Sequence, residues 1–337
     1  MAPEQEVRSR SVLTGSLTAE QPTVLTASTS DPRCLDIALV NNMPDAALRA
    51  TERQFTALLQ EAAQGMPVRL RLFALSGVPR GEAGRQHISG YSPIDSLWNH
   101  PVDGLIVTGA EPKAAVLSEE PYWSSLTRLI EWAERCTTST IWSCLAAHAT
   151  VLHLDGIARR PLAEKRFGVF GVARLEDHPL LSAALRAMTM PHSRWNDVAE
   201  PALRRSGYRV LTRSDAGVDM FVKQRKSLFV FFQGHPEYEA DTLLLEYRRD
   251  VGRFLRGERD TYPQQPQDYF DEESVGWLER FEMRGRADRR EELLNDLPTA
   301  RIAGALVNTW RPAAVGMYRR WLLHLHSKRQ DTVPQMT

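Results

Sequence analysis

Short apolar strands alternate with amphipathic helices along most of this 337-residue chain, and that alternation limits the possible folds more than any other feature. Four early segments have the apolar or alternating pattern of strands: Leu35–Val40, Val68–Leu75, Gly104–Gly109 and Ser139–Ser143. Apolar residues at helical spacing follow Pro44 and recur over Trp123–Arg135. Strands and helices that alternate in this way form βαβ units, whose parallel sheet has helices on both faces. We therefore predict a doubly wound, mostly parallel α/β fold.

Three regions of different character divide the chain. Residues 1–33 are rich in Ser, Thr, Glu and Pro without a sustained period, which predicts a flexible N-terminal segment. Residues 34–256 are expected to form one α/β domain. Residues 257–337 begin with a Pro- and Gln-rich loop and continue as charged helices, the last near Ala303–His326, which predicts a helical C-terminal extension packed on the same domain. Later strands are expected at Phe167–Val172, Tyr208–Thr212, Met220–Lys223 and Leu228–Phe232.

The balance of charge argues against partners that bind by bulk electrostatics. The chain has 42 Lys and Arg against 42 Asp and Glu, so neither nucleic acid nor an acidic membrane is an expected partner. No apolar run approaches the roughly 20 residues that cross a bilayer, and residues 1–10 lack the pattern of a secretory signal. Three cysteines without metal-ligand spacing, Cys34, Cys136 and Cys144, predict reduced thiols and no metal site. We expect a cytoplasmic protein that acts on small molecules.

Cys144 lies where the predicted strand Ser139–Ser143 meets a helix-favouring run that begins at Leu145. A thiolate at this turn gains from the positive end of the helix dipole, and the free N–H groups there can hold the oxyanion that forms when a thiol attacks a carbonyl. Active sites of open α/β sheets form outside the carboxyl ends of the strands, where Cys144 is expected. A buried structural cysteine is the alternative. The predicted strand Gly104–Gly109 also ends at this edge, so its loop can bring backbone amides close to the site.

The strand Leu228–Phe232 is followed by Gln233-Gly234-His235-Pro236-Glu237, and this run favours the catalytic interpretation of Cys144. If the backbone stays extended through Pro236, the side chains of His235 and Glu237 point to the same side. His235 can then take the thiol proton, while Glu237 orients the ring and supports its charge. His148, one helical turn after Cys144, is expected to pack or to form a hydrogen bond instead.

These residues resemble the homoserine O-acyltransferase (homoserine O-succinyltransferase) family of methionine biosynthesis, relatives of the class I glutamine amidotransferases. The similarity runs in one order from about Leu35 to Asp250. The matching segments are Asn42-Met43-Pro44, Thr51-Glu52-Arg53-Gln54-Phe55, Asp103-Gly104-Leu105-Ile106-Val107-Thr108-Gly109-Ala110, Tyr122-Trp123, Cys144, Glu164-Lys165, Pro191-His192-Ser193-Arg194, Gly234-His235-Pro236-Glu237-Tyr238 and Arg249-Asp250.

The resemblance implies roles for individual residues. Cys144 would accept the acyl group of acyl-CoA as a thioester, with His235 as general base and Glu237 supporting it. The bound amino acid would then take the acyl group on its hydroxyl. Three positions match the family's amino-acid-binding residues: Lys165, Ser193 and Arg249. The resemblance implies acyl-CoA, either succinyl-CoA or acetyl-CoA, as a co-substrate with no bound cofactor, and a homodimer is possible.

Lys113 departs from the family at the position on which the choice of acyl donor depends. In the family, Glu at this position is typical of enzymes that use acetyl-CoA, and Gly of those that use succinyl-CoA. The ammonium group of Lys113 should attract the free carboxylate of succinyl-CoA, so we expect a succinyl donor. Other departures, such as Asp45-Ala46-Ala47 where the family has lysines, leave serine or another hydroxy amino acid open as acceptor. The alternatives are an amino-acid O-acetyltransferase of a specialised pathway, a Cys-His-Glu hydrolase or amidotransferase, and a binding protein that kept the fold.

Overall fold

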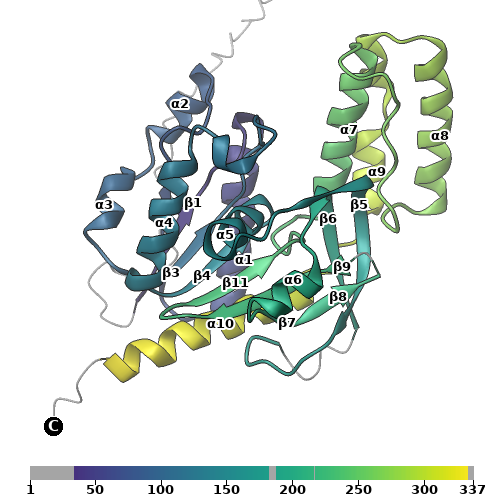
Figure 1. Ribbon diagram of the computed structural model, residues 1–337. Coiled ribbons are helices and arrows are strands. Elements are labelled where there is room, and N and C mark those ends of the chain that lie inside the picture. Colours follow the sequence, from purple (N-terminus) through teal and green to yellow (C-terminus); the bar gives the residue numbers. More distant parts are fainter. Residues whose placement is uncertain (1–33, 182–186, 216, 333–337) are drawn as a thin grey trace, which may run out of the picture.

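The structure is a computed structural model that describes residues 34–181, 187–215 and 217–332, and its main sheet confirms the predicted fold class (Figure 1). The flexible segment predicted for residues 1–33 lies outside the described residues. In the described part the main sheet has the strand order β2-β1-β3-β4-β11-β10-β7. The first five strands are parallel, and β10 and β7 are antiparallel at one edge. The strands are β1 (Leu35–Val40), β2 (Val68–Phe73), β3 (Val102–Val107), β4 (Thr137–Ser143), β7 (Arg209–Val210), β10 (Met220–Gln224) and β11 (Leu228–Phe232).

Helices cover both faces of this sheet, because its central strands are buried on both sides. One face packs on α1 (Leu48–Ala63) and α10 (Arg311–Thr332), through residues such as Phe55 and Leu322. The other face packs on α4 (Trp123–Cys136), α5 (Leu145–Asp155) and α6 (Glu200–Arg205). The molecule is therefore doubly wound, and α10 returns from the end of the chain to complete the face that α1 begins (Figure 1).

A second sheet, fully antiparallel, was not predicted from the sequence. Its order among the described residues is β6-β5-β8-β9, and its strands are β5 (Arg160–Arg174), β6 (Ala187–Asp197), β8 (Thr212–Ser214) and β9 (Gly217–Val218). The single strand expected over Tyr208–Thr212 is wrong, because the chain leaves the main sheet after Val210 and enters the second sheet at Thr212. The long β5–β6 pair carries Lys165 and Ser193 toward the edge where β4 and β11 end.

A separate apolar cluster holds the helices α7 (Thr242–Leu255), α8 (Glu272–Ala287), η3 (Glu291–Asp296) and α9 (Thr299–Ala305), which project from the sheets in Figure 1. The helix expected near Ala303–His326 is wrong in its bounds, since α9 ends at Ala305 and α10 begins at Arg311. Asn308 separates them, and its Oδ1 accepts a hydrogen bond of 2.9 Å from the Arg311 amide. The division of the chain at residue 257 stays a prediction.

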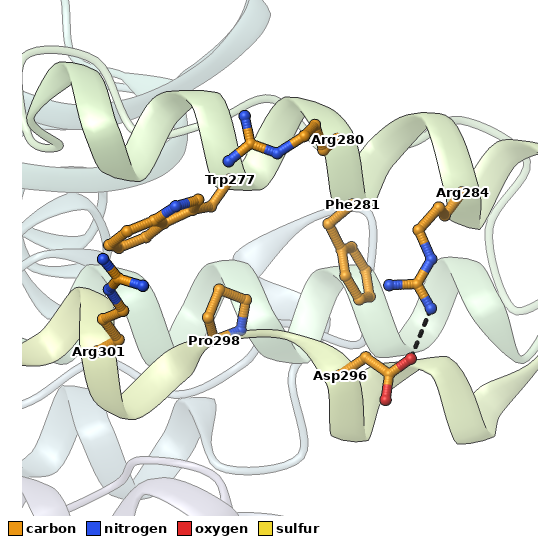
Figure 2. A pocket seen from close by; sticks show the side chains of 7 residues that line it. All are labelled: Trp277, Arg280, Phe281, Arg284, Asp296, Pro298 and Arg301. Carbon is orange, nitrogen blue, oxygen red and sulfur yellow. Dashed lines mark hydrogen bonds and ion pairs between the residues drawn. The ribbon is translucent and has the colours of Figure 1, made fainter.

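A groove of about 330 Å³ lies between α8 and α9 (Figure 2). Arg301 stacks on Trp277 at 4.0 Å, and Arg284 bonds Asp296 at 2.6 Å. None of the residues predicted to form the active site lines this groove. The remaining short helices are η1 (Asp45–Ala47), α2 (Glu82–Ile88), α3 (Ile94–Trp98) and η2 (Leu117–Glu119). No helix in the described ranges is both long and apolar enough to cross a membrane.

Candidate active site

The strands β4 and β11 are parallel neighbours that end at the same level. Ser143, the last residue of β4, pairs with Phe232, the last residue of β11. The ladder continues one step further, where the Cys144 amide donates a hydrogen bond of 2.8 Å to the Phe232 carbonyl. The residues that follow each strand therefore leave the sheet side by side, and this places Cys144 close to the Gln233–Glu237 turn.

Cys144 occupies a strained turn between β4 and α5. Its φ of 52° and ψ of −112° lie in a region that side-chain-bearing residues avoid, at a cost on the order of 1–3 kcal/mol. The turn makes Cys144 the residue that caps α5 and keeps its side chain partly exposed. At Leu145, the first helical position, the N–H has no carbonyl partner within the helix and is free to bind an oxyanion.

Gly109 lies against this first turn of α5. A Cβ at Gly109 would lie 2.7 Å from the Leu145 Cβ and 3.0 Å from the Leu145 nitrogen. Only glycine lets the loop after β3 approach so closely. The loop after β3 therefore lies directly against the turn that holds Cys144.

His235 and Glu237 form a hydrogen bond of 2.8 Å between Nδ1 and Oε1. The expectation of an extended backbone through Pro236 is wrong: the chain turns there, with the Tyr238 amide donating to the His235 carbonyl at 3.2 Å. The turn still brings the two side chains together. Burial lowers the pKa of His235, but the charges of Glu237 and Cys144 and hydrogen bonds to both raise it well above 6.5. A Cys-His-Glu arrangement of this kind favours proton transfer from the thiol to the imidazole.

His148 forms a structural hydrogen bond with Gln233, as expected. Its Nε2 lies 2.8 Å from Oε1 of Gln233, whose Nε2 in turn donates to the Val218 carbonyl at 2.7 Å. Burial lowers the pKa of His148 to about 4, so the ring is neutral at pH 7. This buried chain ties α5 to the segment that carries His235.

The three predicted amino-acid-binding residues meet around two carboxylates of α7. Lys165 of β5 bonds Asp250 at 3.2 Å and lies 3.8 Å from Glu246. Ser193 of β6 donates to Glu246 Oε2 at 2.5 Å. Arg249 lies 3.0 Å from Asp250 and 3.9 Å from Glu246, and its side chain is 48% exposed. The cluster contains both signs of charge within a few ångströms, as an amino acid with an ammonium and a carboxylate requires.

Tyr238 connects this cluster to His235. Its ring stacks on the His235 ring with centroids 4.3 Å apart, and its hydroxyl donates to Glu246 Oε1 at 2.6 Å. The His235 amide also bonds the Pro191 carbonyl of β6 at 2.9 Å, two residues before Ser193. The basic and acidic side chains of the cluster therefore lie directly beside the Cys-His-Glu arrangement.

Lys113 lies in the loop after β3 with its side chain exposed. Glu120 holds this loop, since its Oε1 accepts hydrogen bonds of 2.6 Å from the Lys113 amide and 2.8 Å from the Ala114 amide. Glu111 of the same loop lies 3.9 Å from Arg253 of α7. Glu120 thus fixes the loop backbone, and within the described ranges no hydrogen bond or ion pair orients the Lys113 side chain.

Neither Glu246 nor the contact of Tyr238 with His235 was predicted from the sequence. Glu246 lies in a charged helix, where acidic residues are usually solvated, so only its place one turn before Asp250 could have drawn attention to it. Tyr238 follows the predicted His-Pro-Glu run directly and was noted only as part of a matching segment. Among the described residues, no group of three or more His, Cys, Asp or Glu could hold a metal ion.

Comparison with known sequences gives a consistent result. The sequence profile of the homoserine O-succinyltransferase family matches residues 14–332. A homoserine O-succinyltransferase of Rhodopseudomonas palustris is 49% identical over 298 residues, which cover 88% of this chain and 90% of the relative. One from Methylorubrum extorquens is 48% identical over 292 residues, covering 86% and 87%.

The solved structures that match this chain are more distant in sequence. A glutamine amidotransferase from Methylobacillus flagellatus is 17% identical with a TM-score of 0.48, and the match covers 87% of this chain and 95% of that one. A glutamine amidotransferase from Thermotoga maritima is 12% identical with a TM-score of 0.46, covering 87% and 98%.

Proposed function

The chain belongs to the homoserine O-succinyltransferase family, and from this premise we propose that it transfers the succinyl group of succinyl-CoA to the hydroxyl of homoserine, through a thioester on Cys144. The enzyme is thus an acyltransferase that acts on small molecules. Acyl-CoA is its co-substrate, and the reaction has two halves that share one thiol and one imidazole.

In the first half, His235 takes the proton of the Cys144 thiol and the sulfur attacks the carbonyl of succinyl-CoA. The oxyanion accepts a hydrogen bond from the Leu145 N–H, with the loop at Gly109 beside it. When the tetrahedral intermediate collapses, the bond to the CoA sulfur breaks and His235 returns the proton to that sulfur. The succinyl group remains on Cys144 as a thioester.

In the second half, His235 takes the proton of the homoserine hydroxyl, whose oxygen attacks the thioester. The carbon–sulfur bond to Cys144 breaks, and His235 returns the proton to the thiolate. The products are O-succinylhomoserine and the free enzyme. Glu237 stabilises the imidazolium in both halves, because its carboxylate bonds Nδ1 at 2.8 Å.

The cluster on α7 would bind the acceptor by its amino and carboxylate groups. Arg249 is half exposed and can form two parallel hydrogen bonds to the acceptor carboxylate. Glu246, together with the Ser193 hydroxyl, would hold the acceptor ammonium. Lys165, which bonds Asp250, keeps that carboxylate paired while the acceptor binds. Tyr238 then fixes the distance between Glu246 and His235, so the acceptor hydroxyl reaches the imidazole.

Lys113 would favour a succinyl donor, since its ammonium attracts the free carboxylate of that group. We also expect the enzyme to act in the cytoplasm and as the homodimer that the family resemblance implies. Light scattering should then give a mass of about twice the 38.1 kDa of one chain.

The observation that carries this proposal is that β4 and β11 end in register, which sets Cys144 beside a hydrogen-bonded His235 and Glu237. The test is to treat the protein with succinyl-CoA alone and weigh it by intact mass spectrometry. We expect one succinyl adduct, lost in Cys144→Ser and released when homoserine is added. Cys136→Ser is the matched control, because Cys136 is also partly exposed, and it should keep the adduct. A wild-type protein that gains no mass would contradict the proposal.

A further inference from the structure

Two side chains from the link between α9 and α10 donate hydrogen bonds to one backbone carbonyl at the candidate site. The Trp310 indole donates to the Tyr238 carbonyl at 2.9 Å, and the Asn308 side-chain amide donates to the same oxygen at 3.1 Å. Trp310 is 1% exposed and belongs to the apolar cluster that holds α7, α8 and α9. The two donors lie 72 and 70 residues after Tyr238, so a segment distant in sequence holds the turn that follows His235.

Tyr238 is the residue through which this contact reaches the chemistry. Its ring lies on the His235 ring, with centroids 4.3 Å apart and planes at 16° to each other. Its hydroxyl donates to Glu246 at 2.6 Å. Burial and the charge of Glu246 raise the pKa of Tyr238 well above 10, so the hydroxyl stays protonated and remains a donor. A shift of Tyr238 would therefore move Glu246, the proposed partner of the acceptor ammonium, relative to the imidazole.

His235 itself has two anchors that do not involve Trp310 or Asn308. Its amide donates to the Pro191 carbonyl at 2.9 Å, and its Nδ1 lies 2.8 Å from Oε1 of Glu237. Loss of one donor to the Tyr238 carbonyl should therefore leave the imidazole able to take the thiol proton. The part of the site that loses support is Tyr238, which connects His235 to the acceptor cluster on α7.

We infer that Trp310 and Asn308 are positioning residues for the transfer of the acyl group to the acceptor. By holding the Tyr238 carbonyl they set the distance between the acceptor cluster on α7 and His235. The inference rests on the proposed function, because it assigns the groups that align the homoserine hydroxyl with the imidazole. A misaligned hydroxyl attacks the thioester more slowly, although the amino and carboxylate groups of the acceptor stay bound.

The test measures the two half-reactions separately in Trp310→Phe, which keeps an aromatic ring and removes the indole N–H. The acyl-enzyme is formed with succinyl-CoA, and its decay is followed by rapid-quench mass spectrometry over a range of homoserine concentrations. The maximal rate of transfer should fall about 10-fold, the effect of one lost hydrogen bond. The homoserine concentration at half-maximal rate should change by less than about 3-fold, and so should the rate of Cys144 acylation.

Trp321→Phe is the matched control, because Trp321 is also 1% exposed and its indole also donates one hydrogen bond, to Ser139 Oγ at 3.0 Å. Ser139 lies in the first half of β4, away from the end that carries Cys144. Urea unfolding should show similar losses of stability in the two Phe variants. Trp321→Phe should nevertheless transfer the acyl group at the wild-type rate.

Asn308→Asp supplies a second variant, which decides the question even if Trp310→Phe does not fold. Oδ1 of Asn308 accepts a hydrogen bond of 2.9 Å from the Arg311 amide, and an Asp carboxylate can accept the same bond. A negative charge at the start of α10 also favours that helix. The carboxylate cannot donate to the Tyr238 carbonyl, so the maximal rate of transfer should again fall about 10-fold in a folded protein.

Four outcomes would overturn the inference. Equal slowing of acylation and transfer would make the two donors a support for His235 or for the fold, and wild-type transfer in either folded variant would exclude a positioning role. A comparable loss in Trp321→Phe would assign the effect to the stability of α10. If the wild type forms no acyl-enzyme, or does not release it to homoserine, the proposed function fails and the inference fails with it.

Discussion

His235 and Glu237 are joined by a 2.8 Å hydrogen bond across a turn, although Pro236 lies between them. The sequence suggested that an extended backbone would align the two side chains. In the structure a tight turn does so instead, and both side chains are buried. Because the carboxylate is held two residues from the ring it serves, the orientation of His235 depends on a local contact and not on the docking of a distant element.

Glu237→Gln should lower kcat/KM for succinyl-CoA on the order of 10²- to 10⁴-fold, because the imidazolium loses the charge that stabilises it. The same charge helps to raise the pKa of His235, so its removal should move the alkaline limb of the pH profile to lower pH. Steady-state rates from pH 6 to 10 check both effects. Glu239→Gln, two residues further along, is the control and should leave the profile unchanged. An unshifted alkaline limb in Glu237→Gln would count against the assigned role.

Glu246→Gln should raise the KM for homoserine about 10- to 100-fold, which corresponds to the loss of one charged hydrogen bond. Succinylation of Cys144 should proceed at nearly the wild-type rate, because Glu246 contacts the acceptor and not the donor. Separate assays of adduct formation and of adduct release by homoserine distinguish the two steps. Glu279→Gln, exposed on α8, provides the charge-matched control. Slower adduct formation in Glu246→Gln would show that Glu246 acts on Cys144 and His235 instead.

Gly109→Ala should reduce the rate of acyl-enzyme formation about 100-fold, since the new methyl group displaces the first turn of α5 by a fraction of an ångström or more. The cause is the 2.7 Å approach of a Cβ at this position to the Leu145 Cβ. Gly171→Ala on β5 is the matched control, because a Cβ there meets nothing within 4 Å. Rapid-mixing measurements on both variants compare the rates. Equal activity of the two variants would exclude a tight fit at Gly109.

Because of His148, the free energy of unfolding should be lower in mild acid than at neutral pH. Its pKa is about 4 in the folded protein, below the ordinary 6.5, so the unfolded chain binds a proton more readily between these values. Its stabilising contribution is complete above pH 6.5 and is lost as the pH falls toward 4. From pH 7 to pH 5 the loss amounts to about 2 kcal/mol. Urea unfolding at both pH values should show this loss in wild type and a smaller one in His148→Gln.

The parallel half of the sheet could be predicted well, because a buried strand has an apolar pattern that does not depend on its neighbours. The strands Leu35–Val40 and Leu228–Phe232 were predicted with the observed bounds. Of the antiparallel sheet only part of β5 was predicted, as the strand Phe167–Val172, since Pro191, His192 and Arg194 interrupt the apolar pattern of β6. Its long pairing with β5 is a non-local contact that no local pattern reveals.

The residues of the candidate site could be predicted from the sequence, but their contacts with one another could not. The prediction that Glu237 lies beside His235 assumed an extended backbone, which is wrong. The actual turn depends on contacts such as the 2.9 Å hydrogen bond from the Trp310 indole to the Tyr238 carbonyl. The break between α9 and α10 had a visible cause in Asn308 and Pro312, which were not weighed as a cap and a helix start. Glu246 is a charged residue of α7 whose contacts with Ser193 and Tyr238 no local sequence pattern reveals.

The position of α10 has a consequence for how the enzyme is made. Its Trp321 donates to Ser139 at 3.0 Å, and its Arg329 bonds both Asp103 and the Cys34 carbonyl, so it covers β3 and β4. While the chain leaves the ribosome, β1, β3 and β4 emerge long before the helix that shields one of their faces. Until α10 has left the ribosome, that apolar face stays open to other chains and to chaperones. The sheet that carries Cys144 is therefore covered on both faces only after α10 has been translated and docked.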